Sequence, residues 1–405
     1  MNRYLVGGAV RDRLLGRPVS ENDWLVTGIT GEALMQLGFK PVGRDFGIFL
    51  HPSTKEQYAL PRGEGVTATE RELVERDLRL RDLTVNAIAI AENGELIDPL
   101  SGQRDIEAKV LHHAPGFSQD PVRILRLARL SARLADAGFR IAPETILLAQ
   151  QMASDGALTA AAPERLWGEI AKALSEPHPW IFFETLRCLG ALRVVLPEVD
   201  RLFGVPQPVQ HHPEIDTGVH SLLTLERACE LSTDPRIRLA ALLHDLGKGS
   251  TPQKHWPRHI GHEQRGAHLA EILCRRLRAP RQYRELAVAT ALLHTDVHRA
   301  FLLKPETLLK KLKQLDAFRR PERIESLLLA CAADIRGRPG HETENYPQAE
   351  YLQCVRLAAR QVDGKTVAQI EKAGRAVGKR IDGIRIQQIS EVKRAWCQDG
   401  DGSRI

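Results

Sequence analysis

Long apolar runs are absent from the sequence, and aromatic residues are scarce. No stretch approaches the ~20 consecutive apolar residues of a membrane-spanning helix, and the first residues lack the apolar core of a signal peptide. We therefore expect no membrane partner and a cytoplasmic location. Aromatic side chains make up only 5% of the 405 residues, which argues against a surface that binds nucleic acid by stacking its bases.

Cysteine pairs with metal-binding spacing are also absent. The chain contains six cysteines, none in a CxxC motif and all in segments with a helical pattern: Cys188, Cys229, Cys274, Cys331, Cys354 and Cys397. This spacing predicts reduced thiols with structural roles, and it argues against a disulfide framework.

Charge and length fit a protein of several domains that binds a polyanion. The net charge is +6 and the pI is about 9.0, which suits nucleic acid without requiring it. At about 150 residues per domain, the length predicts two to four domains.

The first 24 residues predict a nucleotide-binding arrangement of strand, glycine turn and helix. Residues 4–6 favour a strand, and Gly7 with Gly8 allows the backbone to turn and approach a ligand closely. A helix beginning near Ala9 would point free N–H groups at that ligand, for which phosphate is the favoured candidate. Arg11 adds a positive charge at the same place.

A pair of acids follows on the next expected strand. Glu21 and Asp23 stand at i and i+2, so both carboxylates would project from one face, roughly 7 Å apart. Two such acids can share a pair of Mg²⁺ ions about 4 Å apart, which clamp the attacking and leaving oxygens of a phosphoryl transfer. Acids on an exposed strand are usually only a solvated face, but their closeness to the glycine turn favours the functional interpretation.

Only the first ~110 residues show several short strand-like runs. The turn AENGEL, with Asn93 and Gly94 at its centre, predicts a hairpin. From Leu111 onward the pattern is helical almost to the end, with no further strand pair expected. A linker is predicted from Leu202, where three prolines interrupt the pattern, and a second boundary near Pro305.

Two arginine motifs follow the strand-rich region. Arg81 and Asp82 stand just before an expected strand, where a surface ion pair is the simpler interpretation. In QDPVRILRLARLSAR, Asp120 suits an N-cap before Pro121 in the first helical turn. Four arginines would then lie within about 120° on one helix face, a pattern that a solvated face also produces: Arg123, Arg126, Arg129 and Arg133.

A third motif is rich in histidine. Ten of the fifteen histidines lie between His211 and His298. In RLAALLHDLGKG, His244 and Asp245 adjoin at a helix end that Gly247 stops. His220 lies upstream of this pair, and His262, His294 and the more distant Asp334 lie downstream. Mixed imidazole and carboxylate ligands suit Ni²⁺, Mn²⁺, Co²⁺ or Mg²⁺ better than a closed structural zinc site.

These motifs, in this order, resemble the HD-containing bacterial tRNA CCA-adding proteins over nearly the whole chain. GGAVRD with the two acids resembles the nucleotidyltransferase head of CCA-adding enzymes and bacterial poly(A) polymerases, and HHPEIDTGVHS, HDLGKG and ADIRGR resemble the HD phosphohydrolases. The resemblance implies an α+β fold, with a small mixed-sheet head followed by mostly helical parts. It implies a nucleotidyltransferase head (residues 1–112), a helical neck and body with the base-reading helix (113–215), an HD domain (216–320) and a C-terminal helical region that supplies Asp334 (321–405).

The resemblance also implies activities and residue roles. The protein would add C, C and A to tRNA 3′ ends from CTP and ATP without a nucleic-acid template, as a monomer or homodimer, and its HD domain would hydrolyse phosphomonoesters and 2′,3′-cyclic phosphates. In the head, Glu21 and Asp23 would hold Mg²⁺, and nucleotide would be bound by Gly8, Arg11, Arg81, Asp82, Asp120, Arg123, Arg126 and Arg129. In the HD domain, the ligands would be His220, His244, Asp245 and Asp334, with His262 and His294 lining the site.

Base choice is implied for Asp120 and Arg123. Cytosine and adenine each show an amino donor beside a ring-nitrogen acceptor, whereas uracil and guanine show a carbonyl beside an N–H group. A carboxylate that accepts and a guanidinium that donates therefore fit C and A.

The head departs from the family pattern at several positions. Glu21 replaces the usual Asp, and Gln57 stands where the family has another acid, while the neighbouring Glu56 should point to the opposite sheet face. Gln119 and Leu80 replace a Glu and a basic residue, and the charged loop after residue 62 is short. Two hypotheses follow: a working CCA-adding enzyme, which we favour, or a tRNA-end phosphohydrolase whose head is weak or only binds tRNA. A poly(A) polymerase is disfavoured because the HD region is not expected there.

Overall fold

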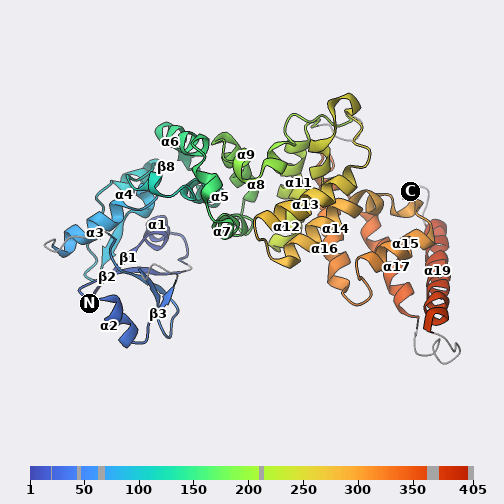
Figure 1. Ribbon diagram of the computed structural model, residues 1–405, viewed down its shortest axis with the longest axis horizontal. Helices are drawn as coiled ribbons and strands as arrows, with labels where there is room; N and C mark the ends of the chain where they lie inside the picture. The colour runs from blue at the N-terminus through green and yellow to red at the C-terminus, as the bar shows by residue number, and fades with distance from the viewer. Residues whose placement is uncertain (20, 43–46, 63–68, 209–213, 363–373, 400–405) are drawn as a thin grey trace. The chain divides into compact units, whose positions relative to one another are not determined.

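The structure is a computed structural model that describes residues 1–405 apart from 20, 43–46, 63–68, 209–213, 363–373 and 400–405. Two compact units are present, one comprising residues 1–161 with 184–194 and the other 162–183 with 195–405 (Figure 1). A small mixed sheet at the N-terminus is followed by helices, so the predicted α+β class is confirmed. Within the described ranges, no helix has the length and apolarity needed to cross a bilayer.

A mixed sheet forms the first part of the first unit. In the described part of the chain it has seven strands in the order β3-β4-β5-β2-β1-β6-β7. Their bounds are β1 (Asn2–Val6), β2 (Asp23–Thr27), β3 (Lys40–Val42), β4 (Ile48–Leu50), β5 (Gln57–Ala59), β6 (Ala89–Ala91) and β7 (Leu96–Ile97). All neighbouring strands are antiparallel except β2 and β5, which run parallel with Asp23 opposite Gln57.

Helices surround this sheet and continue beyond it. The helices that lie wholly in the first unit are α1 (Gly8–Leu14), α2 (Gly31–Gln36), α3 (Glu70–Arg79), α4 (Gly102–Ala108), α5 (Arg123–Arg133) and α6 (Pro143–Ser154). Successive residues of β2 point to opposite faces, so Leu25 packs with Val74 and Leu78 of α3, whereas Val26 packs with Leu34 of α2. Both faces of the sheet are therefore buried at its centre.

Local sequence signals account for two of these elements. Thr69 and Glu72 form a capping box at the start of α3, with each side chain bonding the other's backbone N–H. The expected hairpin is present as β6 and β7, and Gly94 takes the left-handed φ of +87° that the turn requires. The predicted loop before α3 lies mostly outside the described residues.

Three sequence predictions in this unit were wrong in detail. Residues 110–111 (β8, Val110–Leu111) pair in parallel with β9 (Arg140–Ile141), so a strand pair does extend beyond Leu111. A two-residue strand is too short to show alternation. The segment after Asp82 forms a 3₁₀ turn (Thr84–Asn86) before β6 begins. Helix α5 begins at Arg123, later than expected, because residues 121–122 form a turn in which Asp120 Oδ1 accepts from the Val122 N–H.

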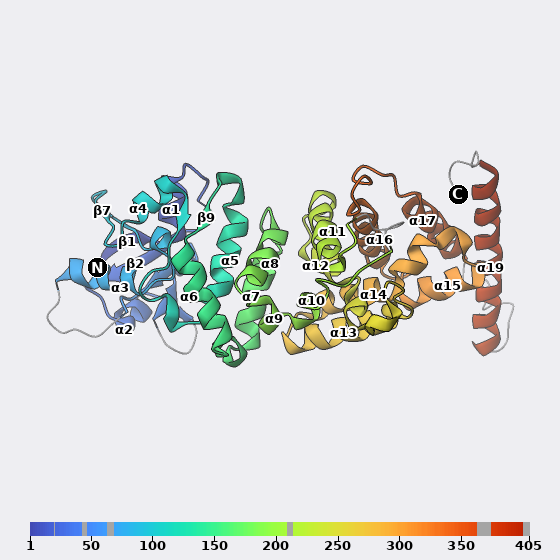
Figure 2. The ribbon, with the colours of Figure 1, turned by 90° about the horizontal axis from the view of Figure 1, so that it is seen from above.

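The second unit is helical. The remaining helices in chain order are α7 (Pro163–Ala173), α8 (Pro179–Cys188), α9 (Leu192–Val195), α10 (Pro197–Asp200), α11 (Thr217–Leu231), α12 (Pro235–Leu243), α13 (His262–Arg276), α14 (Arg281–His298), α15 (Pro305–Gln314), α16 (Pro321–Arg336), α17 (Pro347–Arg360) and α19 (Gly374–Asp399). Helices α11, α12, α14 and α16 pack on one another (Figure 2). Their shared core includes Ala228, Ile237, Ala240, Leu286 and Ala333.

Helix α12 is the central element of this core. Every residue from Ile237 to Leu243 is buried, so the helix has no solvent-exposed face in that stretch. The small side chains Ala240 and Ala241 allow neighbouring helices to approach closely. The end of α12 therefore delivers His244 and Asp245 into the interior of the unit, where both are about 1% exposed.

Candidate functional site

The glycine turn after β1 brings together residues from three distant segments. Gly7 has a left-handed φ of +74°, and a Cβ built on it would lie 3.0 Å from Arg81 Nη1 and 3.9 Å from Asp23 Oδ2. The missing side chain thus leaves a space bordered by a guanidinium and a carboxylate. We call Gly7, Asp23 and Arg81 the head centre.

The two predicted metal-binding acids differ in how they are held. Asp23 is the first residue of β2, whereas Glu21 is exposed and precedes the strand, so a strand does not set the expected spacing between them. Gln57 stands in register with Asp23 on the parallel strand β5. Glu56 accepts hydrogen bonds from Asn22 Nδ2 (2.8 Å) and from the Trp24 indole, and it therefore faces the other side, as expected from strand alternation.

Arg81 and Asp82 are both engaged in ion pairs. Arg81 Nη2 lies 3.1 Å from Asp77 Oδ2, and the carboxylate of Asp82 lies 3.0 Å from Arg126 Nε. Burial raises the pKa of the Asp82 carboxyl, but Arg126 and the hydrogen bonds from Asn86 and the Leu83 N–H together lower it below its ordinary value. The side chain of Arg126 is half-exposed, whereas Asp82 is buried. The buried Asp82 therefore holds Arg126, a predicted phosphate-binding residue, at the surface of the head.

Two other predicted nucleotide-binding cations are buried in the described structure. Arg123 donates to the carbonyl oxygens of Leu80 (2.8 Å), Arg81 (3.0 Å) and Gly116. Arg11 donates to Asp12 and Asn86 beneath the glycine turn. Arg123 thus holds the backbone near the head centre, whereas Arg11 binds side chains.

The remaining predicted residues of the head lie close to these. Gly8 is the first residue of α1, where a Cβ would lie 3.4 Å from Arg11 Nη2. Asp120 precedes the turn that leads into α5, and Arg129 is half-buried on that helix. Arg133, at its end, binds the buried Asp12 at 2.8 Å.

The HD motif forms a tight turn against the start of α13. A Cβ on Gly247 would lie 1.9 Å from the carbonyl oxygen of His262, so only glycine permits this approach. The turn therefore brings His262, the first residue of α13, next to Asp245. Their closest atoms, His262 Nε2 and Asp245 Oδ1, are 3.4 Å apart.

The structure divides the six predicted HD residues into two groups of three, each compact enough to hold a metal ion: His220, His244 and Asp334, and Asp245, His262 and His294. Within each group, the candidate ligand atoms all lie within 4.8 Å of one another. Asp245 adjoins both groups, because its Oδ2 is 3.0 Å from His244 Nε2 and its Oδ1 is 3.6 Å from His294 Nε2. We call these six residues the HD centre.

The hydrogen bonds of the four imidazoles fit cation binding. His244, His262 and His294 each place Nδ1 against a backbone carbonyl oxygen, which assigns the N–H to Nδ1. His220 Nδ1 lies 2.9 Å from the Glu214 carboxylate. His220 thus faces a carboxylate at each ring nitrogen. The Nε2 atoms of His244, His262 and His294 present lone pairs toward other acceptors, an arrangement that a divalent cation satisfies.

The pKa shifts agree with this arrangement. Burial lowers the pKa of His262 to about 4, so its ring is neutral near pH 7 and can act as a ligand. Burial opposes ionisation of Asp245 and Asp334, but the surrounding histidines, and Lys248 beside Asp245, together hold the pKa of both carboxyls well below the ordinary value. Both acids are thus ready to bind a cation.

Sequence reasoning missed several residues that contact the HD centre. Lys248 Nζ lies 2.6 Å from Asp245 Oδ2 and also contacts Gln207. His298 Nε2 lies 2.7 Å from Asp334 Oδ2. Two signals were available: Lys248 is part of HDLGKG, and His298 follows His294 by four residues, which places both on one face of a helix.

Comparison with known families gives three matches along the chain. Residues 3–112 match the family described as "Poly A polymerase head domain", residues 138–203 match "Probable RNA and SrmB- binding site of polymerase A", and residues 217–336 match "HD domain". The head centre and the HD centre thus lie in a polymerase-type head and in an HD domain.

Curated relatives match nearly the full length. A "Multifunctional CCA protein" from Teredinibacter turnerae is 53% identical, and one from Thioalkalivibrio sulfidiphilus is 52% identical, each over 93% of this chain and 95% of the relative. The chain therefore belongs to the family of multifunctional CCA proteins, which confirms the resemblance.

Solved structures show the same fold. A CCA-adding enzyme in complex with ATP matches with a TM-score of 0.66 at 20% identity, covering 97% of this chain and 88% of that one. The Bacillus stearothermophilus CCA-adding enzyme in complex with CTP matches with a TM-score of 0.60 at 22% identity, covering 98% and 95%.

Proposed function

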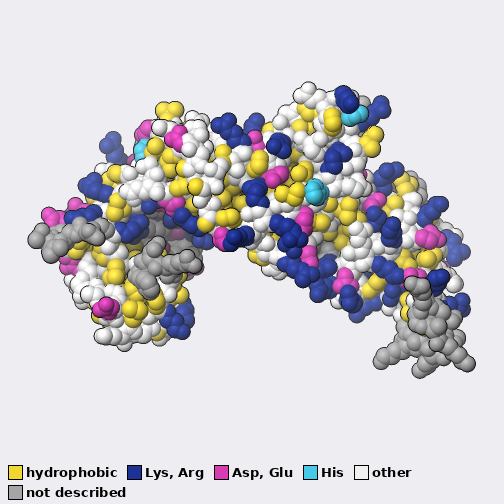
Figure 3. Space-filling model, in the orientation of Figure 1, with side chains coloured by type: hydrophobic (Ala, Val, Ile, Leu, Met, Phe, Trp, Pro, Cys, Tyr) yellow, Lys and Arg dark blue, Asp and Glu magenta, His cyan; other side chains and the backbone are white. Residues whose placement is uncertain are grey.

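We propose that this protein adds C, C and A to the 3′ end of tRNA from CTP and ATP, and that its HD centre hydrolyses phosphomonoesters and 2′,3′-cyclic phosphates. The observation that carries the first activity is the convergence of Gly7, Asp23 and Arg81 in a chain more than half identical to multifunctional CCA proteins. Lys and Arg side chains across the visible face, with the net charge of +6, suit a tRNA backbone (Figure 3). We place the protein in the cytoplasm, as a monomer or homodimer.

In the head centre, we assign Mg²⁺ binding to Asp23 and Glu21, with the Gln57 amide oxygen as a neutral neighbour. Bound Mg²⁺ would stabilise the attacking and leaving oxygens of nucleotidyl transfer. Arg81 borders the glycine turn and is positioned to bind the triphosphate. Asp120 and Arg123 are assigned to the base, and Arg126 and Arg129 to the phosphates.

In the HD centre, we assign a divalent cation to His220, His244 and Asp334, and a second to Asp245, His262 and His294. Ni²⁺, Mn²⁺, Co²⁺ and Mg²⁺ all suit these nitrogen and oxygen ligands. A bound cation would supply an activated water for hydrolysis. Lys248, beside Asp245, adds a positive charge for a phosphoryl oxygen.

The direct test of nucleotide addition is incubation of the purified protein with tRNA lacking its CCA end, Mg²⁺ and each labelled nucleoside triphosphate in turn. Incorporation of C and A, but not of U or G, would support the proposal. No incorporation, together with hydrolysis of a 2′,3′-cyclic nucleotide, would favour the second hypothesis of a phosphohydrolase with an inactive head. Gln57 favours that hypothesis, because it places an uncharged side chain in register with Asp23.

We expect natural nucleotide addition to be slow, and the double variant Glu21→Asp, Gln57→Glu to be faster by ~10-fold or more. A carboxylate at residue 57 adds negative charge beside Asp23, and ~1.4 kcal/mol of transition-state stabilisation suffices for a tenfold gain. The Mg²⁺ concentration for half-maximal rate should fall as well. Initial rates of CTP incorporation over a Mg²⁺ series measure both effects.

Ser53→Glu is the matched control, since it adds one acid in an exposed turn before β5 and should leave the rate unchanged. A fast natural protein whose double variant is slower would mean that the site is adapted to Glu21 and Gln57. A protein that adds no nucleotide in either form would identify the head as a binding module.

Arg123→Ala should reduce both the rate and the base selectivity of addition. Each well-placed paired contact contributes ~1 to 3 kcal/mol of base discrimination, so UTP and GTP should become relatively better substrates. Loss of the bonds to the Leu80 and Arg81 carbonyls accounts for part of the lower rate. kcat/KM for all four nucleotides is the measurement, with the exposed Arg140→Ala as control. A slower but equally selective variant would show that Arg123 only supports the backbone.

A further inference from the structure

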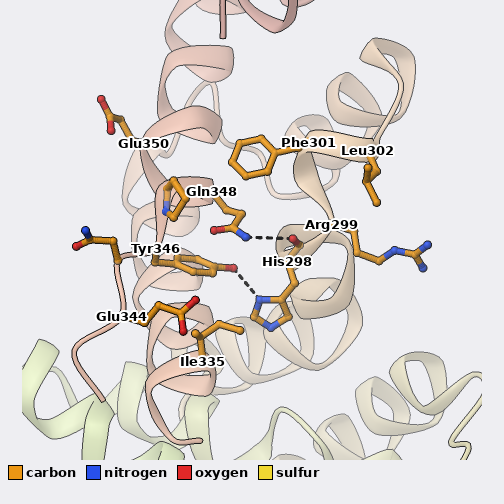
Figure 4. A pocket seen from close by; sticks show the side chains of 11 residues that line it. His298, Arg299, Phe301, Leu302, Ile335, Glu344, Tyr346, Gln348 and Glu350 are labelled. Carbon is orange, nitrogen blue, oxygen red and sulfur yellow. Dashed lines mark hydrogen bonds between the residues drawn. The ribbon is translucent and has the colours of Figure 1, made fainter. Parts of the chain in front are cut away.

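Asp334 of the HD centre is held by a chain of hydrogen bonds that reaches beyond the matched HD region. Its Oδ2 lies 2.7 Å from His298 Nε2, at the end of α14. His298 Nδ1 in turn lies 2.9 Å from the hydroxyl of Tyr346 (Figure 4). Tyr346 directly precedes α17, past residue 336, where the match to the HD family ends.

The direction of each hydrogen bond follows from the groups involved. An ionised carboxylate only accepts, so His298 Nε2 carries the hydrogen and donates to Asp334. In the neutral imidazole, Nδ1 is then the acceptor, and the Tyr346 hydroxyl donates to it. The same segment also holds the backbone of His298, because Gln348 Nε2 donates to its carbonyl oxygen at 3.3 Å.

The hydrogen bond from His298 constrains the orientation of the Asp334 carboxylate. Oδ2 accepts from His298, whereas Oδ1 lies 3.1 Å from His220 Nε2, within the first group of candidate metal ligands. The bond from His298 restricts rotation of the carboxylate, so Oδ1 stays beside His220 Nε2 and Oδ2 stays 3.7 Å from His244 Nε2, the two imidazoles of that group. Without His298, the carboxylate could rotate toward Arg338, whose Nη2 is 3.5 Å from Oδ1.

We propose that His298 and Tyr346 are positioning residues that hold Asp334 in the orientation needed to bind a divalent cation, so that the segment before α17 is part of the HD centre. This inference rests on the proposed metal-dependent hydrolysis.

A cavity beside Tyr346 allows the chain of hydrogen bonds to be broken with little change in packing. His298 and Tyr346 line a cavity of about 960 Å³, together with Phe301, Ile335 and Gln348 among others (Figure 4). Removing the hydroxyl of Tyr346 therefore alters the wall of a cavity and not a closely packed core. Tyr346→Phe thus removes one hydrogen bond and keeps the ring.

The test is calorimetric titration of Mn²⁺ into the chelator-treated full-length protein. His298→Ala should raise the dissociation constant by ~10 to 100-fold, the range for loss of a residue that orients a ligand. Tyr346→Phe should raise it by about 5-fold, as for loss of one hydrogen bond. His298→Gln should recover most of the affinity, because the amide N–H of Gln can donate to Asp334 from the place of Nε2. If His298 only filled space, Gln would have no such advantage over Ala.

Tyr283→Phe is the matched control, since Tyr283 packs on Trp167 elsewhere in the same unit and its variant should bind Mn²⁺ as the natural protein does. Unchanged Mn²⁺ affinity in both Tyr346→Phe and His298→Ala would overturn the inference. If His298→Ala does not fold, Tyr346→Phe decides alone. A natural protein that neither binds Mn²⁺ nor hydrolyses a 2′,3′-cyclic nucleotide would instead refute the proposed HD function.

Discussion

Asp23→Ala is expected to abolish incorporation of C and A into tRNA while leaving hydrolysis of a 2′,3′-cyclic nucleotide intact. Asp23 begins β2 beside the glycine turn, and its carboxylate is the one predicted metal ligand that the strand itself positions. Metal ions contribute several kcal/mol to phosphoryl transfer, so losing them should lower the rate by ~10³-fold or more. The HD centre belongs to the other compact unit and keeps all its ligands.

The measurement compares both activities in one preparation. Labelled CTP and ATP report addition to a tRNA lacking its CCA end, and a 2′,3′-cyclic nucleotide with Mn²⁺ or Ni²⁺ reports hydrolysis. Asp155→Ala, an exposed change at the end of α6, controls for loss of a surface acid. If Asp23→Ala lost both activities together while remaining folded, the two centres could not be independent.

The arrangement of the head could be predicted from the sequence where short-range signals decide it. Asn93 and Gly94 specify the hairpin because their backbone preferences match the turn. Glu56 and Gln57 point to opposite faces because a strand alternates, and the structure confirms this for Glu56. The residues of β9 gave no comparable signal, since two residues cannot show a period.

The partners of the cations could not be predicted. Arg123 was expected to lie on one face of a helix, but its guanidinium bonds the carbonyl oxygens of Leu80, Arg81 and Gly116. Leu80 and Arg81 are some forty residues away in the sequence. Every residue has a backbone carbonyl oxygen, so the residue types do not indicate which carbonyls will accept a hydrogen bond from an arginine. The start of α5 was placed too early for a related reason, because Asp120 serves equally well in a turn and as an N-cap.

The HD centre shows the same limit. Its six residues were all identified from the sequence, and the structure brings all six together. Asp245 Oδ2 faces His244, whereas Oδ1 faces His262, so Asp245 groups with the histidines on the α13 side. The close approach of Gly247 to α13 brings His262 next to Asp245. Only the three-dimensional packing determines such an approach.

His244→Ala should abolish hydrolysis of a 2′,3′-cyclic nucleotide while sparing nucleotide addition. His244 Nδ1 bonds the Ala241 carbonyl oxygen at 2.7 Å, which directs Nε2 toward the carboxylates of Asp245 and Asp334 at 3.0 and 3.7 Å. Removing the ring deletes one ligand of the first group. It also removes one of the groups that lower the pKa values of the buried acids Asp245 and Asp334. Both effects weaken cation binding and the hydrolysis that depends on it.

The variant can also lose stability, because a buried carboxylate that loses one of its partners is less well compensated. His244→Gln keeps most of the side-chain volume and a polar group, so it separates loss of the ligand from loss of the fold. His268→Ala, on the exposed face of α13, is the matched control and should hydrolyse at the natural rate. The assay measures hydrolysis with Mn²⁺ and with Ni²⁺, alongside CTP incorporation and thermal unfolding. Full hydrolysis by a folded His244→Ala protein would show that His244 is structural and that the metal is bound without it.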